Sequence, residues 1–235
     1  MMSQSHNLKK VPANLPRQKS SIPQRKHVLD LDDFSKEEIL DLLENTSAMK
    51  EVLGRDIKKT PTLRGKTIVT LFFEPSTRTR ASFEQAGKAL SADVINLSGQ
   101  NTSVEKGESL YNTALTIQAM KTDFLIIRHP HSGAPYFLAR HIDSHIINAG
   151  DGSHAHPTQA LLDLYTIQST LGQIKDLCVV IIGDILHSRV ARSNLWGLSA
   201  MGAEITLCSP PTLMPQDFLN SSHQHKGHPF KSVRI

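Results

Sequence analysis

The sequence predicts an α/β protein built on a parallel sheet with helices on both faces. Short apolar runs rich in β-branched residues alternate with longer segments of helical periodicity from about residue 35 to about residue 208. Strands that are joined through helix-length connections pair in parallel, with right-handed crossovers. The 235 residues are 39% hydrophobic and 20% charged, a balance that suits one large domain or two small ones.

The expected elements follow one another along the chain. Ser35 and Glu38 form a capping-box pattern that opens an amphipathic helix ending near Lys50. The apolar runs predict strands at residues 67–73, 93–97, 123–127, 144–149, 177–182 and 203–208. Helical periodicity predicts further helices at residues 81–90, 108–120, 134–141, 157–171 and 188–200.

The charge distribution separates the N-terminus from the rest. Six basic residues precede Asp30, the first acidic residue, whereas the remaining 20 basic residues are fewer than the 22 acidic ones. Residues 1–28 therefore form a basic tail, which its Pro, Ser and Gln content predicts to be disordered. No aromatic residues are interleaved with these charges, so we expect no nucleic-acid partner. An organelle transit peptide over residues 1–26 is the alternative interpretation.

The composition also bears on the compartment. Cys178 and Cys208 each lie in an apolar run, so we expect two small core residues rather than a disulfide, and a reducing cytoplasm. No apolar run reaches the roughly 18 residues that a membrane span needs. The N-terminus lacks the apolar region of a secretory signal. We therefore expect no membrane association.

The strongest chemical signal follows the first expected strand. Residues 76–80 place three hydroxyls and two guanidinium groups, Ser-Thr-Arg-Thr-Arg, at a strand-to-helix turn. A helix N-terminus adds unpaired N–H groups and the positive end of the helix dipole. Together these groups predict a cage for a phosphate-bearing anion.

Polar side chains also follow three later strands. Arg128 comes after the third strand, residues 150–159 after the fourth and residues 183–189 after the fifth. Because ligands of parallel α/β sheets bind beyond the carboxyl ends of the strands, we expect one shared anionic site. The Gly-x-Gly-x-x-Gly fingerprint and histidine pairs of zinc-enzyme type are absent from the sequence, so we expect neither a nucleotide cofactor nor a metal.

Five motifs resemble those of the aspartate and ornithine carbamoyltransferase family. They are the segments 72–80, 103–108, 128–130, 148–152 and 156–163, and the resemblance extends from about residue 28 to about residue 215. Ornithine enzymes typically carry Cys after the His-Pro pair, whereas this sequence has Thr158. The resemblance therefore favours the aspartate branch, with an ornithine-type enzyme as the alternative.

The resemblance implies a reaction and a role for each matching residue. Carbamoyl phosphate and L-aspartate would give N-carbamoyl-L-aspartate and phosphate, an early step of pyrimidine synthesis, without a cofactor or metal. The implied phosphate ligands are Ser76, Thr77, Arg78 and Thr79. The residues implied to polarise the carbonyl oxygen are Thr79, Arg128 and His156, and Gln159 would bind the carbamoyl NH2 group.

The resemblance also implies an assembly. Ser103 and Lys106 would reach the site of a neighbouring subunit, which implies a homotrimer with sites at its interfaces. A regulatory chain as a further partner is left open. The implied domains are a carbamoyl-phosphate-binding domain over residues 29–165 and a partial aspartate-binding domain over 166–215, followed by an atypical polar tail over 216–235.

The aspartate half of the implied site is incomplete. Arg189 would bind an aspartate carboxylate, or would instead pair with Glu74 to hold the domains closed. The family's other aspartate-binding segments have no match, so the chain is expected to be C-terminally truncated. A non-catalytic carbamoyl-phosphate-binding chain is therefore the alternative function. We also expect an exposed apolar patch on the partial second domain, formed by Val179, Val180, Ile181, Ile205 and Leu207.

Overall fold

The computed structural model describes residues 25–98, 109–215 and 231–234. Its strands form two parallel sheets. The first sheet contains β1 (Thr67–Phe72), β2 (Asp93–Ser98), β3 (Phe124–His129) and β4 (His145–Asp151). The second contains β5 (Cys178–Ile182), β6 (Glu204–Ser209) and β7 (Lys231–Arg234). The helices are α1 (Lys36–Leu53), α2 (Thr77–Ala89), α3 (Leu110–Ala119), α4 (Ala134–His141), α5 (Pro157–Leu171) and α6 (Arg189–Ala200), with a short 3₁₀ helix η2 (Pro211–Leu213).

The alternating pattern of the sequence produces the predicted parallel α/β architecture. The strand order of the first sheet is β2-β1-β3-β4, so the chain turns outward in opposite directions from β1 and from β3. The carboxyl ends of β1 and β3 therefore form a topological switch point, where ligands of such sheets bind. The amide of Phe73 donates to the carbonyl oxygen of Arg128 at 2.9 Å and holds these two strand ends together.

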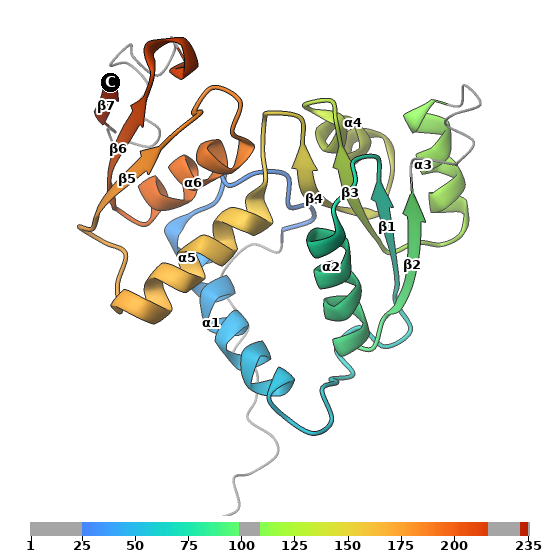
Figure 1. Cartoon of the computed structure of the whole chain (residues 1–235). Coiled ribbons are helices and arrows are strands. Elements are labelled where there is room, and N and C mark those ends of the chain that lie inside the picture. The colour runs from blue at the N-terminus through green and yellow to red at the C-terminus, as the bar shows by residue number, and fades with distance from the viewer. Residues whose placement is uncertain (1–24, 99–108, 216–230, 235) are drawn as a thin grey trace, which may run out of the picture.

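Helices cover both faces of the first sheet, as predicted. Figure 1 places α2 on one face and α3 and α4 on the other. The strands supply apolar residues to both faces: Val69, Leu71 and Leu125 belong to one buried cluster, and Ile68 and Ile126 belong to another. Such near-continuous apolar strands are typical of a parallel sheet buried on both sides.

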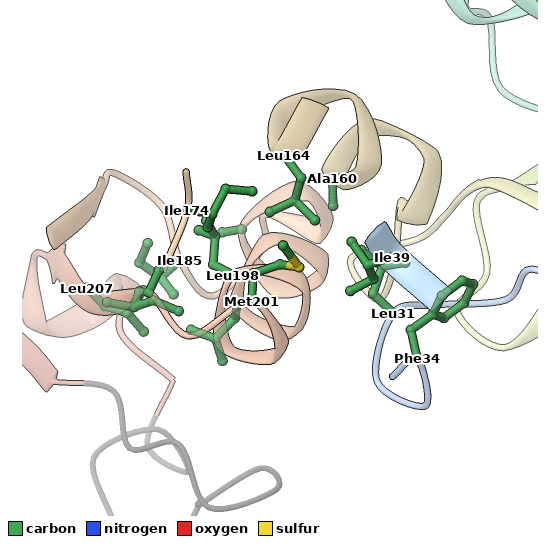
Figure 2. Close-up of a cluster of buried hydrophobic side chains, with 14 of the residues drawn as sticks. Leu31, Phe34, Ile39, Ala160, Leu164, Ile174, Ile185, Leu198, Met201 and Leu207 are labelled. Atoms are coloured by element: carbon green, nitrogen blue, oxygen red, sulfur yellow. The ribbon is translucent and has the colours of Figure 1, made fainter. Parts of the chain in front are cut away.

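A third core joins the N-terminal segment to the second sheet. Helices α5 and α6 lie between the two sheets, with α1 beside α5 (Figure 1). Figure 2 shows Leu31 and Ile39 on one side of α6 and Leu207 on the other, with Leu164 of α5 above them. Gly197 of α6 makes the close packing feasible, because a Cβ there would lie 2.9 Å from both Leu164 and Leu31 side-chain carbons.

The second sheet exposes a different set of apolar residues from the set we expected. Ile205 and Leu207 are buried and Val179 and Ile181 are half-buried, because α6 covers the face toward which they point. Val180 is 55% exposed and Ile182, which we did not expect in the patch, is 73% exposed. The predicted set of five exposed residues was therefore wrong. Successive side chains of a strand point to opposite faces, so neighbouring residues such as Val179 and Val180 cannot share one exposed face.

The expectation about the two cysteines of this region was also wrong. Cys178 is exposed and Cys208 is intermediate, so neither is a fully buried core residue, although both are free thiols. Both lie on the face of the second sheet that α6 does not cover, where Cys208 of β6 pairs with Ile182 of β5. The strand β7, which was not among the predicted strands, pairs in parallel with β6. Among the described helices, none is long and apolar enough to cross a membrane.

Candidate active site

The helix that follows β1 begins four residues earlier than predicted. Ser76 is the N-cap of α2, and its extended backbone (φ −159°, ψ 95°) leads directly into Thr77. The first hydrogen bond within the helix runs from the Arg80 amide to the Ser76 carbonyl oxygen at 3.1 Å. The amides of Thr77, Arg78 and Thr79 therefore point outward from the N-terminus of the helix, where an anion is stabilised.

Two hydroxyls of this turn contact one another, whereas the Arg78 side chain is exposed. The Ser76 hydroxyl donates to Thr79 Oγ1 at 2.9 Å, so two of the implied phosphate ligands are held together. Thr77 and Arg78 are exposed, and no ion pair links the Arg78 side chain to another described residue. A guanidinium without a fixed partner can close on an incoming phosphate.

Arg128 lies at an irregularity of β3. The register between β3 and β4 shifts between Ile127 and His129, and such bulges redirect a side chain. The Arg128 guanidinium donates from Nη1 to the Ala149 carbonyl oxygen at 3.1 Å, and its Nε lies 3.1 Å from Glu74 Oε2. Burial lowers the pKa of Arg128, and the nearby positive charge of Arg189 lowers it further.

Glu74 joins Arg128 to the start of α6. Its Oε2 atom accepts a hydrogen bond from Arg189 Nη2 at 2.9 Å, and Arg189 Nη1 donates to the Gly152 carbonyl oxygen at 3.0 Å. One carboxylate therefore lies between two guanidinium groups, one from β3 of the first sheet and one from α6. Of the two predicted roles for Arg189, this geometry corresponds to the pairing with Glu74.

Glycine at position 150 makes this arrangement feasible. Gly150 has a φ of +116°, and a Cβ there would lie 3.1 Å from Arg128 Nη1 and from both the Cζ and Nε atoms of Arg189. The two guanidinium groups therefore lie directly against the backbone near the carboxyl end of β4. A side chain at this position would displace them and would also strain the backbone.

His156 is buried at the start of α5, where it is the N-cap residue. Burial, followed by the charges of Arg128 and Arg189, lowers the pKa of His156 to about 4. The imidazole is therefore neutral at pH 7. Thr158 Oγ1 lies 3.5 Å from His156 Nδ1, a long contact in which either atom can be the donor. The neutral imidazole carries a single N–H donor, and the tautomer protonated at Nε2 would keep that donor free of Thr158.

Gln159 lies in the first turn of α5 and is oriented by a carboxylate. Its Nε2 donates to Asp163 Oδ1 at 2.9 Å, and Asp163 Oδ2 accepts from Asn194 Nδ2 of α6 at 2.7 Å. Because a carboxylate only accepts, the Gln159 amide nitrogen faces Asp163 and its carbonyl oxygen remains available to a donor.

The structure brings most of the predicted site residues to one edge of the first sheet. Residues 74–79 follow β1, Arg128 ends β3, and His156 and Gln159 follow β4. Ser103 and Lys106 lie outside the described residues. Sequence reasoning did not single out Ser193, whose hydroxyl accepts a hydrogen bond from the His156 amide, or Asp30, which accepts from that hydroxyl. A serine within an amphipathic helix carries no local signal of such a contact.

The fold and these side chains define a class, namely α/β proteins with an anion-binding site at the carboxyl edge of a parallel sheet. A family profile described as "Aspartate/ornithine carbamoyltransferase, carbamoyl-P binding domain" matches residues 26–169. The chain belongs to this family.

Individual relatives point the same way. The "Aspartate carbamoyltransferase catalytic subunit" of Roseiflexus sp. (strain RS-1) is 61% identical over 209 residues, which cover 88% of this chain and 65% of the relative. That of Heliobacterium modesticaldum (strain ATCC 51547 / Ice1) is 57% identical over 194 residues, covering 83% of this chain and 62% of the relative. The chain thus spans less than two thirds of the length of these curated relatives.

Solved structures share the fold. The catalytic subunit of M. jannaschii aspartate transcarbamoylase has a TM-score of 0.78 and 38% identity, covering 89% of this chain and 68% of that chain. Trypanosoma cruzi aspartate transcarbamoylase in complex with carbamoyl phosphate and aspartate has a TM-score of 0.80 and 33% identity, covering 88% of this chain and 66% of that chain.

Proposed function

We propose that this chain transfers the carbamoyl group of carbamoyl phosphate to L-aspartate, giving N-carbamoyl-L-aspartate and phosphate in pyrimidine synthesis. The observation that carries the proposal is the meeting of the α2 N-terminus with Arg128 and His156 at one sheet edge. The T. cruzi relative, which was solved with carbamoyl phosphate and aspartate, supports the choice of substrates. We further propose that the chain acts in the cytoplasm.

The phosphate would bind at the start of α2. The outward amides of Thr77, Arg78 and Thr79 and the helix dipole favour an anion there. Ser76 and Thr79, whose hydroxyls contact one another, would turn toward the phosphate oxygens. The exposed Arg78 guanidinium would then supply paired N–H donors.

The carbamoyl group would bind between β3 and α5. Arg128, Thr79 and the neutral His156 would donate to the carbonyl oxygen, where negative charge grows in the transition state. Gln159, whose amide nitrogen is held by Asp163, would accept a hydrogen bond from the carbamoyl NH2 with its free carbonyl oxygen. The hydrogen-bonding requirements of a carbamoyl group are thereby matched.

The reaction needs no covalent intermediate. The aspartate amine attacks the carbamoyl carbon and forms the new C–N bond. The bond from that carbon to the bridging oxygen then breaks, the phosphate leaves with the electron pair, and the proton lost by the amine passes to the departing phosphate. The protein contributes orientation and preorganised donors, each oxyanion donor supplying on the order of 3 kcal/mol of transition-state stabilisation.

Aspartate would require Arg189 to change partners. In this structure the Arg189 guanidinium is already bonded to Glu74 and to the Gly152 carbonyl oxygen. An aspartate carboxylate would have to replace one of these contacts. This observation favours a second candidate function, a chain that binds carbamoyl phosphate without turning it over.

The proposed site is shared between subunits of a homotrimer. Ser103 and Lys106 would reach the phosphate of a neighbouring subunit. If so, Lys106→Ala and Arg78→Ala chains, each inactive alone, will recover part of the activity when they are mixed and exchange subunits. No recovery under demonstrated exchange would contradict a shared site. Association with a regulatory chain is a further proposal that the same preparation can test by co-sedimentation.

A carbamoylation assay tests the function. The purified chain is supplied with carbamoyl phosphate and either L-aspartate or L-ornithine, and the ureido product is measured. We expect carbamoyl-aspartate to form slowly, because Arg189 is already bonded to Glu74 and Gly152. The rate should fall by a further factor of about 100 in His156→Ala and change little in His145→Ala, an exposed histidine at the opposite end of β4. Product only from ornithine would indicate the ornithine-type enzyme. Binding of carbamoyl phosphate without product would indicate the non-catalytic chain, and absence of both would overturn the proposal.

A further inference from the structure

Three segments far apart in the sequence meet behind the His156 backbone. The His156 amide donates to Ser193 Oγ at 2.9 Å, and the Ser193 hydroxyl donates to Asp30 Oδ1 at 2.6 Å. All three residues are buried, with exposures of 7%, 0% and 3% respectively. They come from the start of α5, the middle of α6 and the segment before α1.

The direction of these hydrogen bonds is determined by their chemistry. A backbone N–H only donates, so the Ser193 oxygen accepts from His156. A serine hydroxyl has one proton, and the carboxylate of Asp30 is the acceptor that lies closest to it. Asp30 therefore holds the Ser193 hydroxyl in the orientation that presents a lone pair to His156.

Burial of the Asp30 carboxylate is energetically unfavourable. Asp30 neighbours Leu31 and the apolar cluster around α5 and α6, and burial raises the pKa of Asp30 to about 6, opposed by its hydrogen bond from Ser193. The charges of Asp32 and His154 act on it in opposite senses. A buried ionisable group of this kind destabilises a core unless its hydrogen bonds compensate.

The Asp30 end of this chain of hydrogen bonds is anchored to the first sheet. The Val28 carbonyl oxygen accepts from the Asn148 amide at 2.8 Å, and Asn148 Nδ2 donates to the Leu29 carbonyl oxygen at 2.9 Å. The segment that carries Asp30 is therefore bonded to β4, the strand from which the His156 loop departs.

We infer that Asp30 and Ser193 are positioning residues that hold His156 in place for the carbamoyl group, a role that rests on the proposed function. His156 is an N-cap with a non-helical backbone (φ −147°, ψ 69°) and no side-chain capping bond. Its carbonyl oxygen accepts from the Ala160 amide of the helix, whereas its own amide is held only from α6. The pair thus sets the direction in which the imidazole leaves the backbone.

The same contact couples His156 to Arg189. Ser193 follows Arg189 by four residues, about one helical turn, on α6. A displacement of α6 therefore moves the guanidinium beside Glu74 and the hydroxyl behind His156 together. This arrangement would link the carbamoyl-binding residues to the helix that carries the proposed aspartate ligand.

The test compares two buried serines of α6. Ser193→Ala removes the acceptor of the His156 amide, whereas Ser199→Ala removes a buried hydroxyl (4% exposed) nearly two turns further along the helix. Binding of carbamoyl phosphate is measured by calorimetry, and the His156 imidazole is followed by NMR pH titration. We expect Ser193→Ala to weaken binding about threefold to tenfold, as one lost hydrogen bond predicts, and to shift the His156 resonances and titration. Ser199→Ala should change neither.

Variants at Asp30 test the same role if Ser193→Ala does not fold. Asp30→Asn retains an oxygen that accepts from Ser193 and should bind nearly as tightly as wild type, whereas Asp30→Leu should weaken binding and shift the His156 resonances. Wild-type binding with unchanged His156 signals in both Ser193→Ala and Asp30→Leu would overturn this inference alone. A wild-type chain that binds neither carbamoyl phosphate nor phosphate would overturn the proposed function, and the positioning role with it.

Discussion

Glu74 and Arg189 are 115 residues apart in the sequence and form a 2.9 Å ion pair between Oε2 and Nη2. Glu74 lies two residues beyond the end of β1, and Arg189 is the first residue of α6. Their side chains are 26% and 16% exposed, so solvent screens the pair only in part. It is a direct polar link between the first sheet and the helix that covers the second.

Glu74→Gln should loosen this link. The amide leaves Arg128 and Arg189 without the carboxylate that separates them, and we expect the free energy of unfolding to fall by about 1–2 kcal/mol after allowance for partial exposure. Urea unfolding measures the change. Glu84→Gln, which removes the exposed i,i+4 pair with Lys88, should cost less. Equal effects would contradict a structural role for the Glu74 pair.

Arg78→Ala should weaken carbamoyl-phosphate binding at least about tenfold, because it removes paired N–H donors to the phosphate. The side chain is exposed, so the thermal unfolding midpoint should hardly move. Titration calorimetry measures the affinity, and Arg64→Ala, an exposed arginine that precedes β1, serves as the matched control. Wild-type affinity in the Arg78 variant would remove this residue from the proposed site.

Gly150→Ala should disturb both arginines. The substitution adds backbone strain of about 1–3 kcal/mol at positive φ and places a Cβ against Arg128 and Arg189. Gly172→Ala is the control, because Gly172 also has a positive φ (+84°) but has no atom within 4 Å of its Cβ position. We expect only Gly150→Ala to lose phosphate affinity. Matching affinities would mean that the crowding is relieved without moving the guanidinium groups.

Asp30→Asn should change how stability depends on pH. The pKa of Asp30 is near 6 in the folded chain, above its ordinary value of 3.8. The folded chain therefore holds the proton more tightly than the unfolded one, which stabilises the fold fully below pH 3.8. This stabilisation is lost as the pH rises through 6. The asparagine variant lacks this loss. Its free energy of unfolding, relative to wild type, should therefore rise by about 2 kcal/mol between pH 4 and pH 7.

Urea unfolding of both chains at four pH values checks this prediction. His156, whose pKa is lowered to about 4, contributes in the opposite sense, since its share of the stability is lost as the pH falls. That share is common to both chains and cancels in the difference. A difference that is independent of pH would show that Asp30 ionises in the folded chain as it does in the unfolded one.

Polar substitutions on β5 should reduce self-association. Val180 and Ile182 lie on the face of the second sheet that α6 does not cover and are 55% and 73% exposed. Replacing both with threonine keeps the β-branched shape and removes apolar surface. Analytical ultracentrifugation should detect less association than in Ile57→Thr, which changes an isolated residue that is 76% exposed. An unchanged sedimentation distribution would mean that this face does not drive association.

Much of the fold follows from the sequence alone. The expected strands match β1 to β6 to within two residues at each end, and the parallel first sheet was predicted correctly. The start of α2 was placed four residues too late, because Thr77 and Arg78 were interpreted as turn residues although they form its first turn. The strand β7 was missed, since a four-residue polar segment at a sheet edge is held by backbone pairing and has no apolar pattern.

The sequence by itself determined the order of elements, the parallel sheet and the turn of hydroxyls and guanidinium groups after β1. These depend on periodicity and turn chemistry, which are local. Only the tertiary structure decided that Glu74 lies between Arg128 and Arg189 and that Asp30 reaches Ser193 across 163 residues. It also decided that α6 buries Ile205 and leaves Val180 exposed. Such contacts depend on how helices pack between two sheets, and no segment of the chain carries that information locally.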